Sequence, residues 1–168
     1  MLRRTVLVSA AYLPAFGRSQ TRKLTMRAKP GEFDASSFGP PRTEATVKGT
    51  LRIVEFDPSS KWPTAAYIGL HQGPNRNESV QVLAIRNHPA DDYMVVGFRH
   101  IAGGKEVEVR SLQNVPLGSV VRVQIAFRDG VAKVRANDAP AFEVSTALRA
   151  VVPYVSVSSG RAEFEVDA

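Results

Sequence analysis

The chain has 168 residues, of which 43% are hydrophobic and 23% are charged, a composition that excludes a disordered chain and predicts a single globular core. It contains no cysteine, which excludes disulfide bonds and thiolate metal sites. The formal net charge is +6 without a long run of lysines and arginines, and we therefore expect no nucleic-acid partner.

The first 19 residues have the pattern of an export signal. Residues 1–4 include two arginines, residues 5–16 carry no charge, and Gly17 and Ser19 are small residues of the kind that a signal peptidase recognises. We expect a signal peptide over residues 1–19, a periplasmic or secreted protein, and no membrane span after cleavage. The alternative is a first β-strand over residues 5–13.

Residues 20–43 form a polar N-terminal extended segment that is rich in proline, glycine and serine. This composition predicts a loop or wrapping segment that precedes the sheet. We expect Phe33 and Phe38 to hold the segment against the body of the domain.

Residues 44–168 predict a single β-sandwich domain built from short antiparallel strands. In the clearest strand, Val121, Val123, Ile125 and Phe127 share one face while polar residues occupy the other, and Asp129-Gly130 then supplies a hairpin turn. No helix longer than one turn is expected. The predicted strands are 44–56, 65–72, 80–87, 93–100, 107–112, 120–127, 131–137 and 141–144, followed by a closing stretch over 154–166.

Strand alternation also predicts which side chains leave the core. Ala66, Ile68 and Leu70 fit the core, which places Tyr67 and His71 together on the opposite face.

The strand predicted over 93–100 adds an arginine to that face. Phe98 is expected to point inward, so that Arg99 points outward beside Gly97. The loop at 72–78 carries amides and a guanidinium that suit sugar hydroxyls or carboxylates, although its Gly-Pro-Asn sequence is equally typical of a plain turn. We therefore predict a ligand-binding face formed by Tyr67, His71, Asn75, Arg76 and Arg99.

The order of the strands, the hairpin at 120–138 and the closing stretch resemble the concanavalin A-like lectin/glucanase jelly roll, over residues 42–168. In that family one sheet is concave and binds glycans, so the resemblance implies a polysaccharide or oligosaccharide partner. Lectins, glucanases, polysaccharide lyases and laminin G-like domains share this fold, and the fold alone therefore names no reaction.

A finer resemblance is to alginate lyases of this fold, which carry Arg-Thr/Ser-Glu, Gln-Ile/Val-His and Tyr-Phe-Lys-x-Gly-x-Tyr motifs. This chain has Arg42-Thr43-Glu44, then Gly69-Leu70-His71, then Tyr-Val-Ser-Val-Ser over 154–158. If the chain were a lyase, the resemblance would make His71 the base and Arg42 the group that neutralises the carboxylate, with Glu44 in the first motif. Serines stand where the family has its lysine and proton-transferring tyrosine, which argues against catalysis.

Other chemistries have weaker patterns. Glu106 and Glu108 share a strand face, as a retaining glycosidase would need, but alternating charges are also typical of a solvated strand. Asp91 and Asp92 fit a turn better than a calcium site, and we expect no metal and no cofactor. Trp62, the single tryptophan, is either a sugar-stacking platform or a hydrophobic lid.

We therefore expect an exported, non-catalytic domain that binds a glycan, in particular an acidic polysaccharide, on the face that carries Tyr67, His71 and Arg99. The alternatives are a divergent polysaccharide lyase acting by β-elimination, a glycoside hydrolase, and a structural or adhesion domain.

Overall fold

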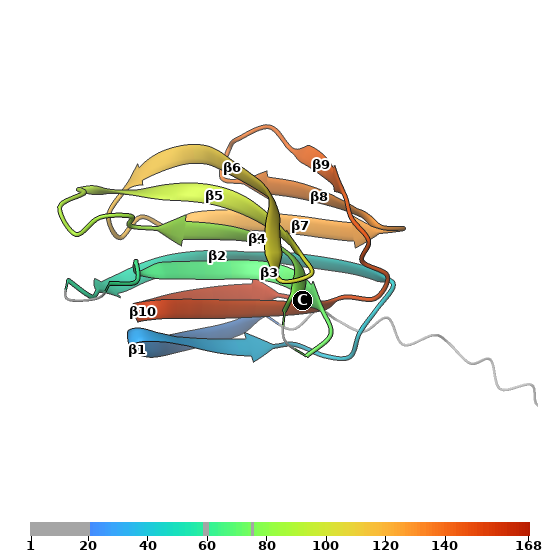
Figure 1. Cartoon of the computed structure of the whole chain (residues 1–168), viewed down its shortest axis with the longest axis horizontal. Helices are drawn as coiled ribbons and strands as arrows, with labels where there is room; N and C mark the ends of the chain where they lie inside the picture. Colours follow the sequence, from blue (N-terminus) through green and yellow to red (C-terminus); the bar gives the residue numbers. More distant parts are fainter. Residues whose placement is uncertain (1–20, 59–60, 75) are drawn as a thin grey trace, which may run out of the picture.

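The computed structural model describes residues 21–58, 61–74 and 76–168. These residues form ten strands and no helix, which confirms the all-β prediction (Figure 1). The described residues therefore contain no helix that could cross a membrane. The expected signal peptide at 1–19 lies outside the described residues and stays a prediction. The strands are β1 (Arg22–Ser37), β2 (Glu44–Phe56), β3 (Ala65–Gln72), β4 (Glu78–Ile85), β5 (Tyr93–Ala102), β6 (Lys105–Pro116), β7 (Val121–Arg128), β8 (Val131–Ala136), β9 (Phe142–Ser145) and β10 (Val152–Asp167).

The strands form one antiparallel sheet that curls into two layers. Its order is β6-β5-β4-β3-β10-β2-β7-β8-β9, and β1 pairs with the remaining edge of β10. The long strand β10 changes partner along its length, since residues 152–158 pair with β3 and residues 160–167 pair with β2. We call β3, β4, β5, β6 and the first half of β10 the first layer, and β2, β7, β8, β9 and the second half of β10 the second layer. The result is the predicted antiparallel jelly-roll sandwich.

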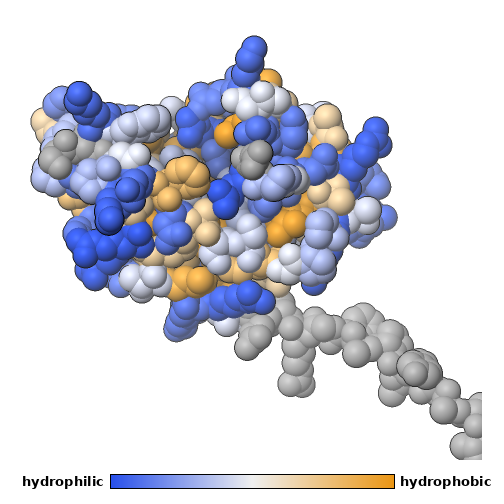
Figure 2. All heavy atoms as spheres, turned by 60° about the horizontal axis from the view of Figure 1, so that its bottom comes forward, coloured by the Kyte–Doolittle hydropathy of each residue, from blue (hydrophilic) through white to orange (hydrophobic). Residues whose placement is uncertain are grey.

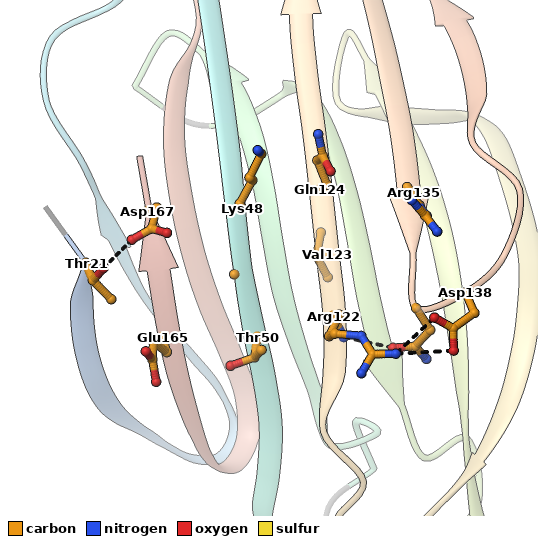
Figure 3. Close-up of a pocket in the computed structure, with 12 residues that line it drawn as sticks. Thr21, Lys48, Thr50, Arg122, Val123, Gln124, Arg135, Asp138, Glu165 and Asp167 are labelled. Atoms are coloured by element: carbon orange, nitrogen blue, oxygen red, sulfur yellow. Dashed lines mark hydrogen bonds and ion pairs between the residues drawn. The ribbon is translucent and has the colours of Figure 1, made fainter. Parts of the chain in front are cut away.

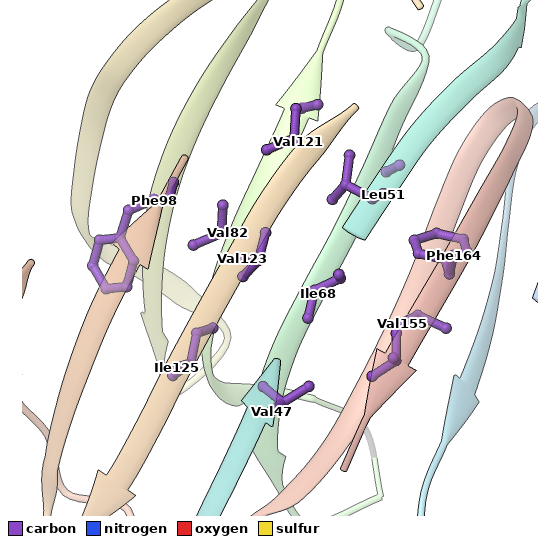
Figure 4. Packing of buried hydrophobic residues seen from close by; sticks show 14 of the residues in the cluster. Val47, Leu51, Ile68, Val82, Phe98, Val121, Val123, Ile125, Val155 and Phe164 are labelled. Atoms are coloured by element: carbon purple, nitrogen blue, oxygen red, sulfur yellow. The ribbon is translucent and has the colours of Figure 1, made fainter. Parts of the chain in front are cut away.

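The core lies between these layers and is made by strand alternation. The predicted inward residues of β7, from Val121 to Phe127, are at most 4% exposed. Figure 4 shows Ile68, Val82 and Phe98 from the first layer beside Val123 and Ile125 from the second. Full burial of an aliphatic or aromatic side chain of this size contributes about 1.5–3 kcal/mol, so this cluster supplies most of the driving force for folding.

The expectation of a loop before the sheet was wrong, because residues 22–37 form strand β1. Met26 and Ala28 of this strand are buried and face the core, and their polar neighbours point outward. The pairing with β10 shifts register between Ala28 and Phe33. Phe38 is buried as predicted, but Phe33 is 70% exposed, because its pairing with Ser158 places it on the outer face of the sheet.

Both β1 and β10 bend where they pass from one layer to the other. Ser159 has a positive φ of 47° and is fully buried, and its hydroxyl accepts a hydrogen bond from the Gly31 amide (3.0 Å). The adjacent Gly160 leaves no room for a side chain. A Cβ there would lie 2.5 Å from the Glu55 carbonyl oxygen and 2.6 Å from Thr64 Cγ2. The bend therefore requires glycine at this position.

We predict that Gly160→Ala lowers the free energy of unfolding by about 1–3 kcal/mol, because backbone must move to admit the methyl group. Gly97→Ala is the comparison, since its added Cβ would meet its nearest atom, the Arg110 carbonyl oxygen, at 3.2 Å and would cost less. Urea denaturation of both variants measures the difference. Equal losses would contradict a special constraint at the bend.

Candidate functional site

The outer face of the first layer aligns residues from four strands into rows. Directly paired residues of antiparallel strands point to the same face. One row runs from Tyr154 on β10 through Gly69 and Gln81 to Arg99 on β5. The row beside it contains Ser156 and Tyr67, followed by Leu83 and Gly97. Tyr154 and Gly69, which are 85 positions apart in the chain, therefore lie side by side on one surface.

A cleft of about 490 Å³ lies over these rows. Three of the predicted ligand-binding residues, Tyr67, Arg76 and Arg99, line it, so strand alternation correctly placed Tyr67 and Arg99 on one surface. Of the other two predicted residues, Asn75 lies outside the described residues and His71 is treated below. The cleft also contains groups that we did not predict as ligands: Phe33, Gln81, Tyr154, Ser156 and Ser158.

Two large aromatic side chains stand at the rim of the cleft. Trp62 is 66% exposed and Phe33 is 70% exposed, and both line the cleft. Of the two roles considered for Trp62, this exposure favours the platform over the lid. Figure 2 shows the side of the molecule on which β1 lies, where hydrophobic areas of the surface alternate with hydrophilic ones.

Tyr154 forms the floor of the cleft because Gly69 leaves space for its ring. A Cβ at Gly69 would lie 2.7 Å from Tyr154 Cε1 and 2.9 Å from Gln81 Cβ. The Tyr154 hydroxyl donates a hydrogen bond to Gln81 Oε1. Burial raises the pKa of Tyr154 well above its ordinary value, so the hydroxyl stays protonated and acts as a donor.

His71 lies on the predicted face of the sheet, but it contacts the Tyr154 ring and does not line the cleft. It is 7% exposed, and its ring packs edge-on against Tyr154 with centroids 5.2 Å apart. Its Nδ1 lies 2.8 Å from the Gly73 carbonyl oxygen, which can only accept, so the proton belongs on Nδ1. Nε2 then accepts from the Ser37 hydroxyl at 3.0 Å.

This environment keeps His71 uncharged. Burial lowers its pKa below the ordinary 6.5, and the nearby Arg76 cation lowers it further, while the bond to the Gly73 carbonyl opposes both. A neutral ring with both nitrogens engaged suits a structural role under Tyr154.

The two arginines of the cleft differ in their partners. Arg99 forms an ion pair with Glu106. The Arg76 guanidinium carbon lies 5.5 Å from the Tyr154 ring centroid and 5.9 Å from that of Phe33. Among the described residues, the buried Nε of Arg76 has no hydrogen-bond partner, and no carboxylate lies within ion-pair distance of the guanidinium.

Of the three residues proposed for catalysis by resemblance, Arg42 and Glu44 lie away from the cleft. Arg42 is held by backbone bonds to Val151 beside β10, and Glu44 pairs with Arg128 on the second layer (3.3 Å). Neither lines the cleft.

Three of the four carboxylates that we considered for hydrolysis or metal binding form local contacts, and the fourth, Asp92, is exposed. Glu106 pairs with Arg99 and Glu108 with Arg110. The Asp91 carboxylate accepts the His88 amide in a turn (3.0 Å). In the part of the chain that the structure describes, no three His, Asp or Glu side chains gather into a metal site.

A second hollow, of about 480 Å³, lies on the outer face of the second layer (Figure 3). There Asp167, Lys48, Gln124 and Arg135 form a row across β10, β2, β7 and β8. Both carboxylates and cations line it, and none of its described lining residues is aromatic. This is the pattern of a solvated sheet face, and it provides matched control positions for the cleft.

The described fold is shared with proteins of known structure. An alginate lyase from Pseudomonas aeruginosa superimposes with a TM-score of 0.53 at 22% identity, over 73% of this chain and 62% of that one. A carbohydrate-binding module from Bacillus subtilis gives 0.53 at 10% identity, over 86% of each chain. The carbohydrate recognition domain of Emp46p gives 0.54 at 8% identity, over 88% of this chain and 87% of that one.

At these identities the likeness shows the fold alone, and the predicted antiparallel jelly-roll β-sandwich is confirmed. The chain spans less than two thirds of the length of the alginate lyase. No protein-family model matches the chain, and no curated protein matches it.

We predict that the free energy of unfolding falls as the pH drops below about 6.5, because the unfolded chain then binds a proton at His71 more readily than the folded chain does. His71→Gln should flatten this decline, and His88→Gln, at an exposed position, is the control substitution. Urea denaturation between about pH 7.5 and about pH 5 measures the slope. An NMR titration midpoint for His71 above 6.5 would contradict the account.

Proposed function

We propose that this protein binds a glycan in the cleft of the first layer. The observation that carries this proposal is the combination of exposed aromatic rings with hydrogen-bonding groups at one site. Trp62, Phe33 and Tyr67 offer apolar faces, and Gln81 and Arg99 offer polar groups in the same cleft. A sugar ring presents C–H groups on its faces and hydroxyls at its edge, which matches such a surface.

The comparisons support the proposal by analogy of fold. The proteins that share the fold include ones described as an alginate lyase, a carbohydrate-binding module and a carbohydrate recognition domain. Fold analogy does not choose between binding and cleavage, and the chemistry of the cleft must do so.

We favour binding without cleavage. A β-elimination needs a base that reaches the sugar, but His71 is buried with both ring nitrogens engaged and does not line the cleft. The Tyr154 hydroxyl, a possible acid, donates to Gln81. We also propose that the protein acts outside the cytoplasm, on the basis of the N-terminal sequence pattern alone.

We predict that Trp62→Ala weakens glycan binding by at least about fivefold, or about 1 kcal/mol, because a stacking surface is lost. Val120→Ala removes another exposed apolar side chain outside the cleft and should leave affinity unchanged. A glycan array identifies the ligand, and titration calorimetry measures both variants.

The same ligand should remain intact after incubation with the protein. New ultraviolet absorbance from unsaturated uronate ends, lost in His71→Ala, would replace the binding proposal with a lyase. Failure of a folded protein to bind any glycan on the array would favour a structural or adhesion role.

A further inference from the structure

Three charged side chains line the cleft, and they are not equivalent. Arg99 is compensated by its ion pair with Glu106. Glu32 is exposed at the rim and forms no ion pair with another described residue. Arg76 alone combines a partly buried guanidinium with a buried Nε that lacks a hydrogen-bond partner.

The position of Arg76 is imposed by the fold. Its backbone adopts a positive φ of 52°, a conformation that is unfavourable for an arginine. The guanidinium lies near the ring faces of Phe33 and Tyr154, and these contacts compensate its charge only in part. The side chain is only partly buried and forms no ion pair with a carboxylate of the described residues, so the arrangement favours a ligand that supplies an anion.

We propose that Arg76 binds the anionic substituent of the glycan, so that the cleft selects an acidic saccharide over its neutral counterpart. The shared chemistry is a planar or tetrahedral oxyanion, namely the carboxylate of a uronic acid or a sulfate ester. Either group accepts two parallel hydrogen bonds from a guanidinium. This assignment rests on the proposed glycan-binding function and names the ligand class for that same site.

The geometry gives the ligand an orientation. Phe33 contributes both to the aromatic rim and to the contact with Arg76, so a sugar ring stacked on Phe33 brings its charged substituent toward the guanidinium. Arg99 is paired with Glu106 and would donate hydrogen bonds to hydroxyl groups of the sugar. Glu32 opposes anions at the rim, and Glu32→Gln should therefore tighten binding of an acidic ligand and not that of a neutral one.

The test uses matched pairs of hexasaccharides with the same linkage: β-1,4-glucan with β-1,4-glucuronan, and β-1,4-mannan with β-1,4-mannuronan. Dextran and dextran sulfate form a third pair that separates sulfate from carboxylate recognition. We predict that the wild type binds the acidic member of at least one pair about 10–100-fold more tightly, as expected for charge-assisted hydrogen bonds. Titration calorimetry at fixed ionic strength measures each affinity.

Arg76→Gln should abolish this preference while the neutral affinity is retained, and Arg76→Lys should retain the preference in part. Arg135→Gln removes the same charge from the second layer and should preserve the full preference. Thermal melting checks that each variant is folded.

The outcomes separate the two proposals. Equal affinity for the acidic and neutral members of every pair that binds, or an equal loss of preference in Arg135→Gln, would overturn the role of Arg76 and leave glycan binding standing. No binding to any member by the folded wild type would overturn glycan binding together with this assignment.

Discussion

The strand that belongs to both layers, β10, is the constraint on which the cleft depends. Its first half pairs with β3 and directs Tyr154, Ser156 and Ser158 to the outer face, whereas its second half pairs with β2 and directs Phe164 into the core. The change happens at Ser159, whose hydroxyl accepts the Gly31 amide. The same bend turns β1, and the floor and one side of the rim therefore follow from a single local geometry.

Within the site, buried residues fix the shape and exposed residues offer chemistry. Because Gly69 has no side chain, the Tyr154 ring can lie across β3, and His71 packs edge-on against that ring. Burial keeps His71 neutral and Tyr154 protonated, so the floor carries no charge of its own. The cation of Arg76 lies against the rings of Phe33 and Tyr154 and is partly shielded from water, which strengthens its interaction with an anion.

Alternation along a strand explains both what the sequence predicted and what it did not. Alternating patterns located β3 and β7, and they placed Tyr67 and Arg99 on the outer face. Strand β1 was missed because Pro30 and Gly31 interrupt a pattern in which only two residues are buried. Tyr154 was missed because its strand is buried on both faces and shows no alternation there. The pairing register aligns Tyr154 with Gly69 and brings Ser37 into contact with His71. This register depends on the whole folded sheet and cannot be derived from the pattern of a single strand.

The ligand is expected to occupy the cleft of the first layer. Chemical-shift mapping by NMR during titration with the tightest-binding hexasaccharide tests it most directly, because every backbone amide and the Trp62 indole report separately. We predict that the largest changes lie at the Trp62 indole and at Tyr67, Gln81 and Arg99, with none at the control row of the second layer. Changes confined to Lys48, Gln124 and Arg135 would contradict the account.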